Sequence, residues 1–277
     1  MKYLLYIIFF YSFIFSQKIL IPMDNNQNDH LKAYGLIYWT LQKEIKVDWI
    51  LNYRDGSFII DNNNMITKEA LIRGITYEPI NVNQLNEIYL TIENNNMDIV
   101  LLEKAPKIAV YTPEDKQPWD DAVTLALAYA EINYDTVFDH EVLMGELVNY
   151  DWLHLHHEDF TGQYGKFYKN YRTRAWYKKL ENDFQQIASE HGFQSVHILK
   201  KTVAQNIKKY IFGGGFIFAM CSATDSFDIA LSAWNTDIAE AVFDGSPVDL
   251  NYKNKLDYSN SIAFENFDLY TSPLIYE

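Results

Sequence analysis

The stretch GGGFIFAMCSATDSFDIALSAW, residues 213–234, decides the fold that we expect for this chain. Three glycines precede an apolar run, FIFAM, which ends at Cys221, and a polar segment with two aspartates then leads into a second apolar run. Glycine adopts the left-handed backbone of a helix C-cap and of a tight turn, so the glycines indicate the end of a helix. The stretch therefore predicts a strand, a sharp turn at Cys221 and a following helix.

Two pairs of strands, each with a helix in between, precede this stretch. KILIPMD at 18–24 and VDWILNY at 47–53 flank the first amphipathic helix. KIAVYTP at 107–113 and YDTVFD at 134–139 flank the second. Short apolar strands that alternate with helices indicate parallel βαβ units. We therefore predict an α/β protein made of two flavodoxin-like halves, whose parallel sheets are flanked by helices.

Each half then reaches a third strand, MDIVLLE at 97–103 in the first and YDWLHLHH at 150–157 in the second. The segment RDGSFIID at 54–61 contains an Asp-Gly pair, which is typical of tight hairpin turns, so we expect a short hairpin insertion there. We place the domain boundary near residues 104–106, which gives an N-terminal domain at 17–105 and a C-terminal domain at 106–277.

The N-terminus, MKYLLYIIFFYSFIFSQ, has one cationic residue, Lys2, followed by an apolar run and then by Ser16 and Gln17. This pattern is typical of a secretory signal peptide, which we place at 1–16. The run is shorter than the ~20 apolar residues of a transmembrane helix. We therefore expect an exported protein, periplasmic or secreted, with no stable membrane insertion after signal cleavage.

The chain carries a net charge of -14, which disfavours nucleic acid and anionic lipid as partners. Its single cysteine, Cys221, excludes an internal disulfide framework. A small polar molecule or a carbohydrate is the partner class that remains, and the sequence indicates no oligomeric state.

Three segments carry a family resemblance: KILIPMD, DWLHLHHEDFTGQYGKF at 151–167, and GGGFIFAMCSATDSFDIAL at 213–231. The order of elements resembles the class I glutamine amidotransferase-like superfamily, including its ThuA-like branch. More closely, the segments resemble a family of exported bacterial proteins commonly labelled asparagine synthetase B, over nearly all of the mature chain. Members of that family run longer at the C-terminus, which implies that a chain ending at TSPLIYE is incomplete.

The chemistry of asparagine synthetase B itself is not supported by the residues. That enzyme uses an N-terminal cysteine and a Ser-Gly-Gly-x-Asp-Ser loop for ATP, whereas Cys221 lies far from the N-terminus. The segment 222–226, Ser-Ala-Thr-Asp-Ser, lacks both glycines that let backbone N–H groups approach phosphate. We therefore predict no nucleotide and no other cofactor.

The class I amidotransferase resemblance implies a nucleophile at Cys221. In that superfamily the cysteine occupies a Gly-x-Cys-x-Gly turn, and the matching positions here are Ala219 and Ala223, both small enough for such a turn. The positive end of the following helix would stabilise a thiolate. The superfamily's histidine and its acidic partner follow the cysteine, but residues 222–277 contain no histidine.

Candidates for the missing base lie at the C-terminal end of the strand 150–157, where doubly wound sheets bind ligands. His156, His157, Glu158 and Asp159 can act as acid and base, hold a polar ligand or bind a metal. Strand alternation places His156 and His157 on opposite faces, so we predict no metal site. The competing interpretation is that His154 packs in the core while Glu158 and Asp159 only cap the next turn.

If the strands ending at His157 and Cys221 are parallel neighbours, their Cα atoms lie within about 12 Å on one rim of the sheet. The residues that we assign to catalysis are Cys221, His156, His157 and Glu158. The residues that we assign to ligand binding are Asp159, Ser222, Asp225, Thr112 and Glu114.

Two functions remain open from the sequence. The first is an exported, cysteine-dependent hydrolase or amidotransferase that acts on a small polar substrate. The second is a non-catalytic ligand-binding or accessory protein, for example one related to carbohydrate, that keeps the fold. The absence of a downstream histidine favours the second, and the clustering of cysteine, histidines and acids at strand ends favours the first.

Overall fold

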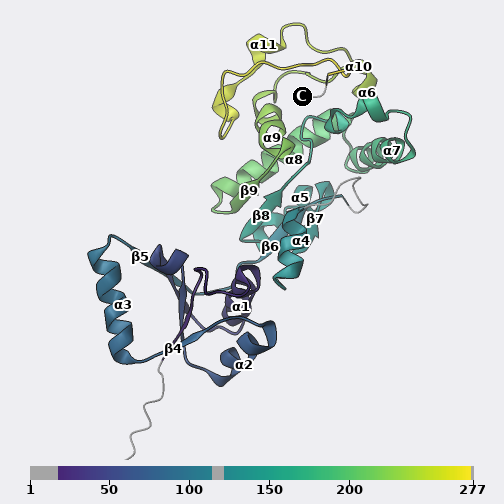
Figure 1. The fold of residues 1–277 in the computed structure, drawn as a ribbon. Coiled ribbons are helices and arrows are strands. Elements are labelled where there is room, and N and C mark those ends of the chain that lie inside the picture. Colours follow the sequence, from purple (N-terminus) through teal and green to yellow (C-terminus); the bar gives the residue numbers. More distant parts are fainter. Residues whose placement is uncertain (1–17, 114–121, 276–277) are drawn as a thin grey trace, which may run out of the picture. The chain divides into compact units, whose positions relative to one another are not determined.

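A computed structural model describes residues 18–113 and 122–275 of the chain (Figure 1). The described residues fold as two compact units: the first holds residues 18–105 together with Val123–Ile132, and the second holds the rest of the described residues. The predicted signal peptide, residues 1–16, lies outside the described residues. None of the helices in the described ranges combines the length and the apolarity that crossing a bilayer requires.

The first unit is a mixed α/β unit built on a five-stranded sheet. Its strands follow the order β4-β1-β3-β2-β5, and every neighbouring pair is antiparallel. The strands are β1 (Lys18–Ile21), β2 (Val47–Leu51), β3 (Phe58–Asp61), β4 (Glu78–Ile80) and β5 (Asp98–Leu102). The helices are α1 (His30–Gln42), the short 3-10 turn η1 (Tyr53–Asp55), α2 (Asn64–Arg73), α3 (Val82–Asn94) and α4 (Ala122–Tyr129).

The prediction of a parallel, flavodoxin-like sheet is wrong for this first unit. β1 and β2 run in the same direction, as the βαβ pattern predicts, but β3 lies between them and is antiparallel to both. The segment 54–61, which we expected as an insertion, instead supplies the turn and the central strand. The N–H of Ile50 donates to the carbonyl of Ser57 at 2.8 Å and closes the β2–β3 hairpin. The apolar run of β3 is buried on both faces, which suits a central strand.

Helices cover both faces of this sheet. Ile19 and Ile21 of β1 pack with residues of α1 and α2, whereas Leu20 between them packs with residues of α3. Figure 1 shows the same three layers, with α3 on one side of the sheet and α1 and α2 on the other. Because side chains alternate along a strand, β1 must be apolar at consecutive positions to serve both layers.

The segment after α4 packs on α1 within the first unit. A Cβ at Gly35 of α1 would lie 1.8 Å from the carbonyl oxygen of Ala130, so only glycine permits this approach. The hydroxyl of Tyr129 in α4 donates to the carboxylate of Asp29, the N-cap of α1, at 2.5 Å. The helix that follows β6 in sequence is therefore part of the first unit.

The second unit contains the parallel sheet that the sequence predicts. Its four strands follow the order β7-β6-β8-β9, and all neighbours are parallel. The strands are β6 (Ile108–Tyr111), β7 (Asp135–Val137), β8 (Trp152–Leu155) and β9 (Phe216–Ala219). The longer helices are α5 (Asp139–Leu143), α7 (Ala175–Glu190), α8 (Val196–Phe212) and α9 (Ser222–Ser232). The short turns are η2 (Glu146–Asn149), η3 (Tyr164–Lys166), α6 (Tyr168–Tyr171), α10 (Ala241–Asp244), α11 (Tyr252–Lys255) and η4 (Tyr258–Asn260).

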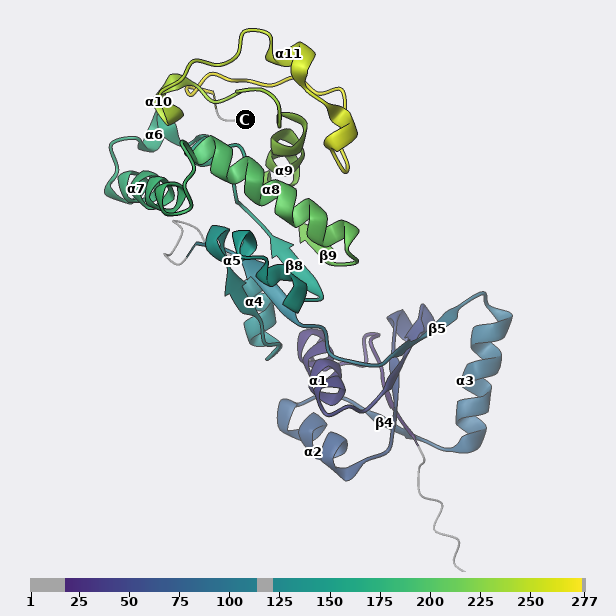
Figure 2. The same cartoon turned by 180° about the vertical axis from the view of Figure 1, so that it is seen from behind.

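The helices α7, α8 and α9 share one hydrophobic core with the sheet of the second unit (Figure 2). Leu153 and Leu155 of β8 contribute to this core with Leu199 of α8 and Phe227 of α9. The chain passes from β6 to β7 on one side and to β8 on the other, so the strand order reverses between β6 and β8. Ligands of open α/β sheets bind at such a point, beyond the carboxyl ends of the strands.

Candidate functional site

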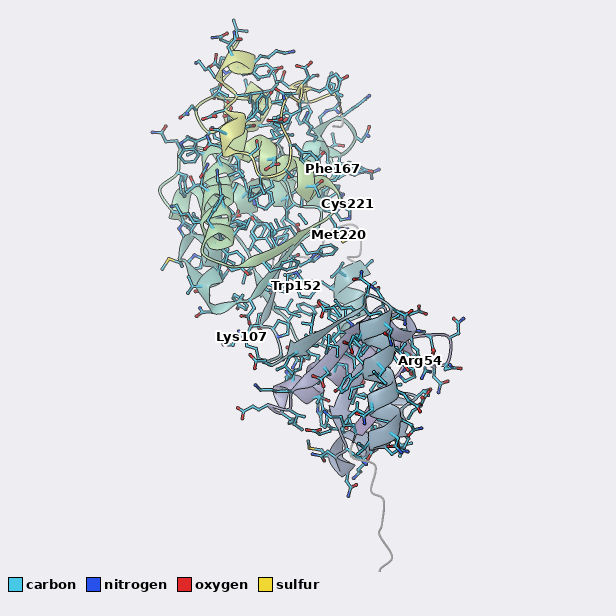
Figure 3. All side chains as sticks on the ribbon, turned by 90° about the vertical axis from the view of Figure 1, so that its left-hand side faces the viewer. Arg54, Lys107, Trp152, Phe167, Met220 and Cys221 are labelled. Carbon is cyan, nitrogen blue, oxygen red and sulfur yellow. The ribbon has the colours of Figure 1, made fainter. Side chains whose placement is uncertain are left out.

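Cys221 occupies a strained turn between β9 and α9 (Figure 3). The N–H of Met220 still donates to the carbonyl of Leu155 on β8, at 2.9 Å, and the chain then turns sharply. At Cys221 φ is 48° and ψ is -138°, a region that residues with a Cβ rarely adopt, and α9 begins at Ser222. The thiol is exposed to solvent. Strained backbone that delivers an exposed thiol to a helix N-terminus is the arrangement of a nucleophile elbow.

The first two turns of α9 are hydrogen-bonded to the segment that follows β8. Three donors in α9 bind three consecutive carbonyls, so hydrogen bonds join the turn of the cysteine to the segment of the two histidines. The hydrogen bonds are Ala223 N–H to His156 at 3.1 Å, Ser222 Oγ to His157 at 3.0 Å and Ser226 Oγ to Glu158 at 2.8 Å. Ser222, which we predicted as a ligand-binding residue, therefore has a positioning role. Ser226 carries no motif in the sequence and was missed.

Two imidazoles lie next to the thiol. One ring nitrogen of His156, one of His157 and the sulfur of Cys221 all lie within 4.8 Å of one another. The two imidazole rings are 3.7 Å apart between centroids. Our expectation that these histidines point to opposite faces is wrong, because β8 ends at Leu155 and strand alternation ends with it. The shared rim of β8 and β9, in contrast, is as the sequence predicts.

His154 lies outside this cluster. It is fully buried in β8, and its Nδ1 donates to the carbonyl of Phe218 at 3.1 Å. The imidazole also stacks on the ring of Phe218 with centroids 5.7 Å apart. His154 is therefore a core residue that links β8 to β9.

Glu158 and Asp159 bind backbone at the end of β8. Glu158 Oε2 accepts from the N–H of His156 at 3.0 Å, which holds the turn that carries both imidazoles. Asp159 accepts four hydrogen bonds from the loop that follows it, so its predicted role in ligand binding gains no support. Its donors are Thr161 N–H at 2.7 Å, Thr161 Oγ1 at 2.5 Å, Gln163 N–H at 2.6 Å and Gly165 N–H at 3.2 Å.

The other residues that we predicted to bind a ligand do not all lie beside Cys221. Asp225 is exposed in the first turn of α9 and accepts from the hydroxyl of Thr224 at 2.9 Å. Thr112 follows β6 and lines a separate, larger cavity. Glu114 lies outside the described residues.

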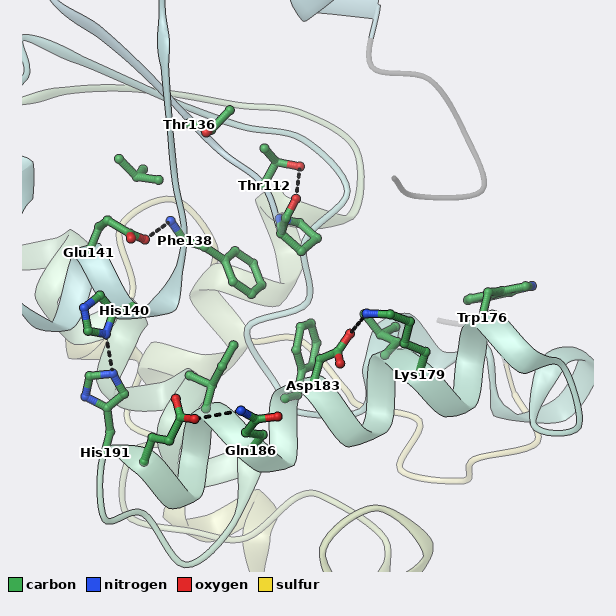
Figure 4. Close-up of a pocket in the computed structure, with 16 residues that line it drawn as sticks. Thr112, Thr136, Phe138, His140, Glu141, Trp176, Lys179, Asp183, Gln186 and His191 are labelled. Atoms are coloured by element: carbon green, nitrogen blue, oxygen red, sulfur yellow. Dashed lines mark hydrogen bonds and ion pairs between the residues drawn. The ribbon is translucent and has the colours of Figure 1, made fainter. Parts of the chain in front are cut away.

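The larger cavity has a volume of about 520 Å³ and lies at the carboxyl ends of β6 and β7, against α7 (Figure 4). His140 and His191 both line it, and His140 Nδ1 lies 3.0 Å from His191 Nε2. Lys179 pairs with Asp183 at 2.9 Å on the α7 side, and Trp176 also lines the cavity. Of the residues that line this cavity, only Thr112 was predicted to bind a ligand, because it lies near the end of the predicted strand at 107–113.

A buried ion pair lies beside the rim. Lys200 Nζ of α8 is 2.8 Å from a carboxylate oxygen of Asp139, the first residue of α5, and both side chains are almost fully buried. Tyr111 donates its hydroxyl to the same carboxylate, and burial together with that negative charge raises the pKa of Tyr111 well above its usual value. Lys200 also borders a small cavity of about 30 Å³ that His157 lines. Sequence reasoning missed this cluster because its three members are far apart in the chain.

Comparison of the chain with known family models, with curated proteins and with solved structures found no match.

Proposed function

We propose that this protein is an exported, cysteine-dependent hydrolase of the amidotransferase-like type, with Cys221 as the nucleophile. One observation carries the proposal: the sulfur of Cys221, exposed on a strained turn, has a ring nitrogen of His156 and one of His157 within 4.8 Å. A thiol next to an imidazole is the pairing that cysteine nucleophiles need, because the imidazole accepts the thiol proton. The resemblance to the class I amidotransferase-like superfamily supports the same assignment.

The proposed reaction is acyl transfer through a thioester. An imidazole, from His156 or His157, takes the proton of Cys221, and the thiolate attacks the carbonyl carbon of an amide or ester. A carbon–sulfur bond forms, the bond to the amine or alcohol breaks, and the imidazolium returns the proton to that leaving group. Water, deprotonated by the same imidazole, then attacks the thioester carbon. The carbon–sulfur bond breaks, the imidazolium returns its proton to the sulfur of Cys221, and the acid is released. The N-terminal end of α9 stabilises the negative charge that develops in each step.

In this proposal the base precedes the nucleophile in the chain, which differs from the superfamily. The segment after Cys221 contains no histidine that could serve as the base. The carboxylate of Asp228 in α9 accepts the N–H groups of Ile262, Ala263 and Phe264, each at 2.7 Å, and so binds the backbone of the C-terminal segment. The hydrogen bonds from α9 to the carbonyls of His156 and His157 support a base in the segment that follows β8, since they hold the backbone of that segment in place.

We propose a small polar substrate because of two cavities, one of which His157 lines. The small cavity that His157 borders shares four lining residues with the larger cavity, so the two adjoin. The larger one carries Lys179, Asp183 and a histidine pair, which are groups that bind polar ligands.

The test is hydrolysis of a panel of small amides and esters, including glutamine and p-nitrophenyl acyl esters, by the mature protein in the presence of a chelator. We expect turnover by the wild type, a thioester adduct on Cys221 in intact-mass spectra, and loss of both in Cys221→Ala. His156→Ala and His157→Ala test the base, and His30→Ala in the first unit is the matched control. Turnover that persists in Cys221→Ala would refute the proposal.

A second candidate is a non-catalytic protein that binds a small polar ligand, for example a carbohydrate. The cavity of about 520 Å³ favours it, because Trp176 provides an aromatic surface beside carboxylate and imidazole groups. Quenching of tryptophan fluorescence by a set of sugars, in wild type and in Asp183→Asn, tests this candidate. Saturable quenching that Asp183→Asn weakens, without any turnover, would favour it over the enzyme.

A further inference from the structure

Imidazole nitrogens and thiolate sulfurs are common zinc ligands, and this chain holds two imidazoles and one thiol together at the end of its parallel sheet. We propose that His156, His157 and Cys221 bind a divalent metal of the zinc class, and that the bound metal prevents Cys221 from acting as a nucleophile. The metal site does not depend on the proposed function. Inhibition by the metal does, because it rests on Cys221 being the nucleophile.

The donor separations are close to those that a tetrahedral ion requires. Bond lengths of about 2.0–2.1 Å to nitrogen and 2.3 Å to sulfur place the ligand atoms of zinc about 3.3–3.7 Å apart. The three donors here lie within 4.8 Å of one another, so small side-chain rotations bring them to that distance. Two residues that are adjacent in sequence can share an ion here because the chain has left the strand at Leu155.

The backbone that carries these donors is held from both sides. His156 and His157 accept hydrogen bonds at their carbonyls from the first turn of α9, the helix that begins directly after Cys221. Glu158 holds the N–H of His156 in addition. A donor set whose backbone does not have to be ordered on binding gains affinity, since the entropic cost of ordering has been met by folding.

The net charge of the chain and the types of donor atom also favour a metal of the zinc class. The chain carries a net charge of -14, which raises the local concentration of cations. Nitrogen and sulfur donors favour zinc over magnesium or calcium, which prefer oxygen. Three protein ligands leave a fourth position for water or an incoming ligand.

A bound metal would make Cys221 unreactive, because the same thiolate cannot serve as metal ligand and as nucleophile. A thiolate bound to zinc has its electron pair in the metal–sulfur bond, and both imidazoles are then occupied as ligands. The metal therefore removes the nucleophile and the base at once, and a chelator restores them.

Cobalt(II) tests the site, because a cobalt–thiolate bond produces charge-transfer absorption in the near ultraviolet. We expect the mature protein to bind one cobalt ion with that absorption, and equimolar zinc to abolish it. Cys221→Ser should lose the absorption, and His156→Gln and His157→Gln should each weaken cobalt binding at least about tenfold. His30→Gln is the matched control that should bind cobalt as the wild type does, and circular dichroism checks that every variant folds.

Absence of the charge-transfer absorption, or absorption that persists unchanged in both histidine variants, would overturn the metal site. The proposed metal site and the proposed function can also be refuted separately. If zinc binds and the metal-free protein forms no thioester with any substrate, the proposed function fails and the metal site stands. If the metal-free protein turns over substrate and zinc neither binds nor inhibits, the metal site fails and the function stands.

Discussion

At the scale of single residues, the backbone of Cys221 stores strain that the rest of the turn imposes. Its φ of 48° and ψ of -138° bring the Cβ close to the backbone, which costs about 1–3 kcal/mol. Cys221→Gly removes the Cβ, whereas Cys221→Ala keeps it. We expect the glycine variant to be more stable than the alanine variant by about 1 kcal/mol. This difference is the relieved strain minus the cost of ordering glycine, which has more conformational entropy in the unfolded chain. Urea unfolding of the two variants measures this, and an alanine variant of equal or greater stability would contradict the strain.

His197, in the first turn of α8, should make stability depend on pH. Its Nδ1 donates to the carbonyl of Thr161 at 2.7 Å, and burial, followed by the charge of Lys201, lowers its pKa below 6.5. Asp237, 3.6 Å from its Nε2, opposes this shift without reversing it. Below about pH 6.5 the unfolded chain therefore binds a proton that the folded chain does not, and the free energy of unfolding falls as pH falls.

The comparison that isolates this group is the wild type against His197→Asn, whose amide can still donate to Thr161. Between about pH 7.5 and about pH 5.5 the wild type should lose more of its unfolding free energy, measured in urea, than the variant loses. Equal losses would show that His197 does not contribute to the pH dependence.

The sequence identified Cys221 at the residue scale, because glycines before an apolar run and a polar segment after it define a strand end. The sequence did not predict that the imidazoles of His156 and His157 lie side by side. Their orientation depends on the position at which β8 ends, and hydrogen bonds from α9 hold the segment after Leu155. No local pattern near the histidines carries that information.

At the scale of elements, the pair of Lys200 and Asp139 holds α8 to α5 in the core of the second unit. Lys200→Met leaves the carboxylate of Asp139 buried without its cation, which should destabilise the protein by about 3–5 kcal/mol. The double variant Lys200→Met with Asp139→Asn should recover part of that loss, since no buried charge remains. Chemical denaturation of the three proteins tests this, and a double variant less stable than Lys200→Met would contradict it.

The parallel sheet of the second unit could be predicted from the sequence, and the antiparallel sheet of the first could not. Both show a strand, a helix and a strand in succession, and this pattern fixes the direction of two strands but not their adjacency. In the first unit the apolar strand Phe58–Asp61 inserts between the two. The choice depends on which strand makes the better pairing with β1, which is a long-range property.

At the scale of the whole molecule, the proposed export predicts a processed N-terminus. Lys2 and the apolar run behind it should direct the chain out of the cytoplasm, and cleavage should leave a mature protein that begins near Gln17. N-terminal sequencing of protein recovered from the exported fraction tests this. A soluble cytoplasmic product that retains Met1 would contradict export.

The central claim concerns one thiol and the imidazoles that the neighbouring strand brings to it. The rate at which iodoacetamide alkylates Cys221 at neutral pH, in metal-free protein, tests that claim most directly. We predict fast alkylation of the wild type and of the control His30→Ala, and a rate at least about tenfold lower in His156→Ala or His157→Ala, because the thiolate needs its imidazole. A thiol that reacts slowly in the wild type, or equally fast in all four proteins, would contradict the account and leave Cys221 as a residue of the turn alone.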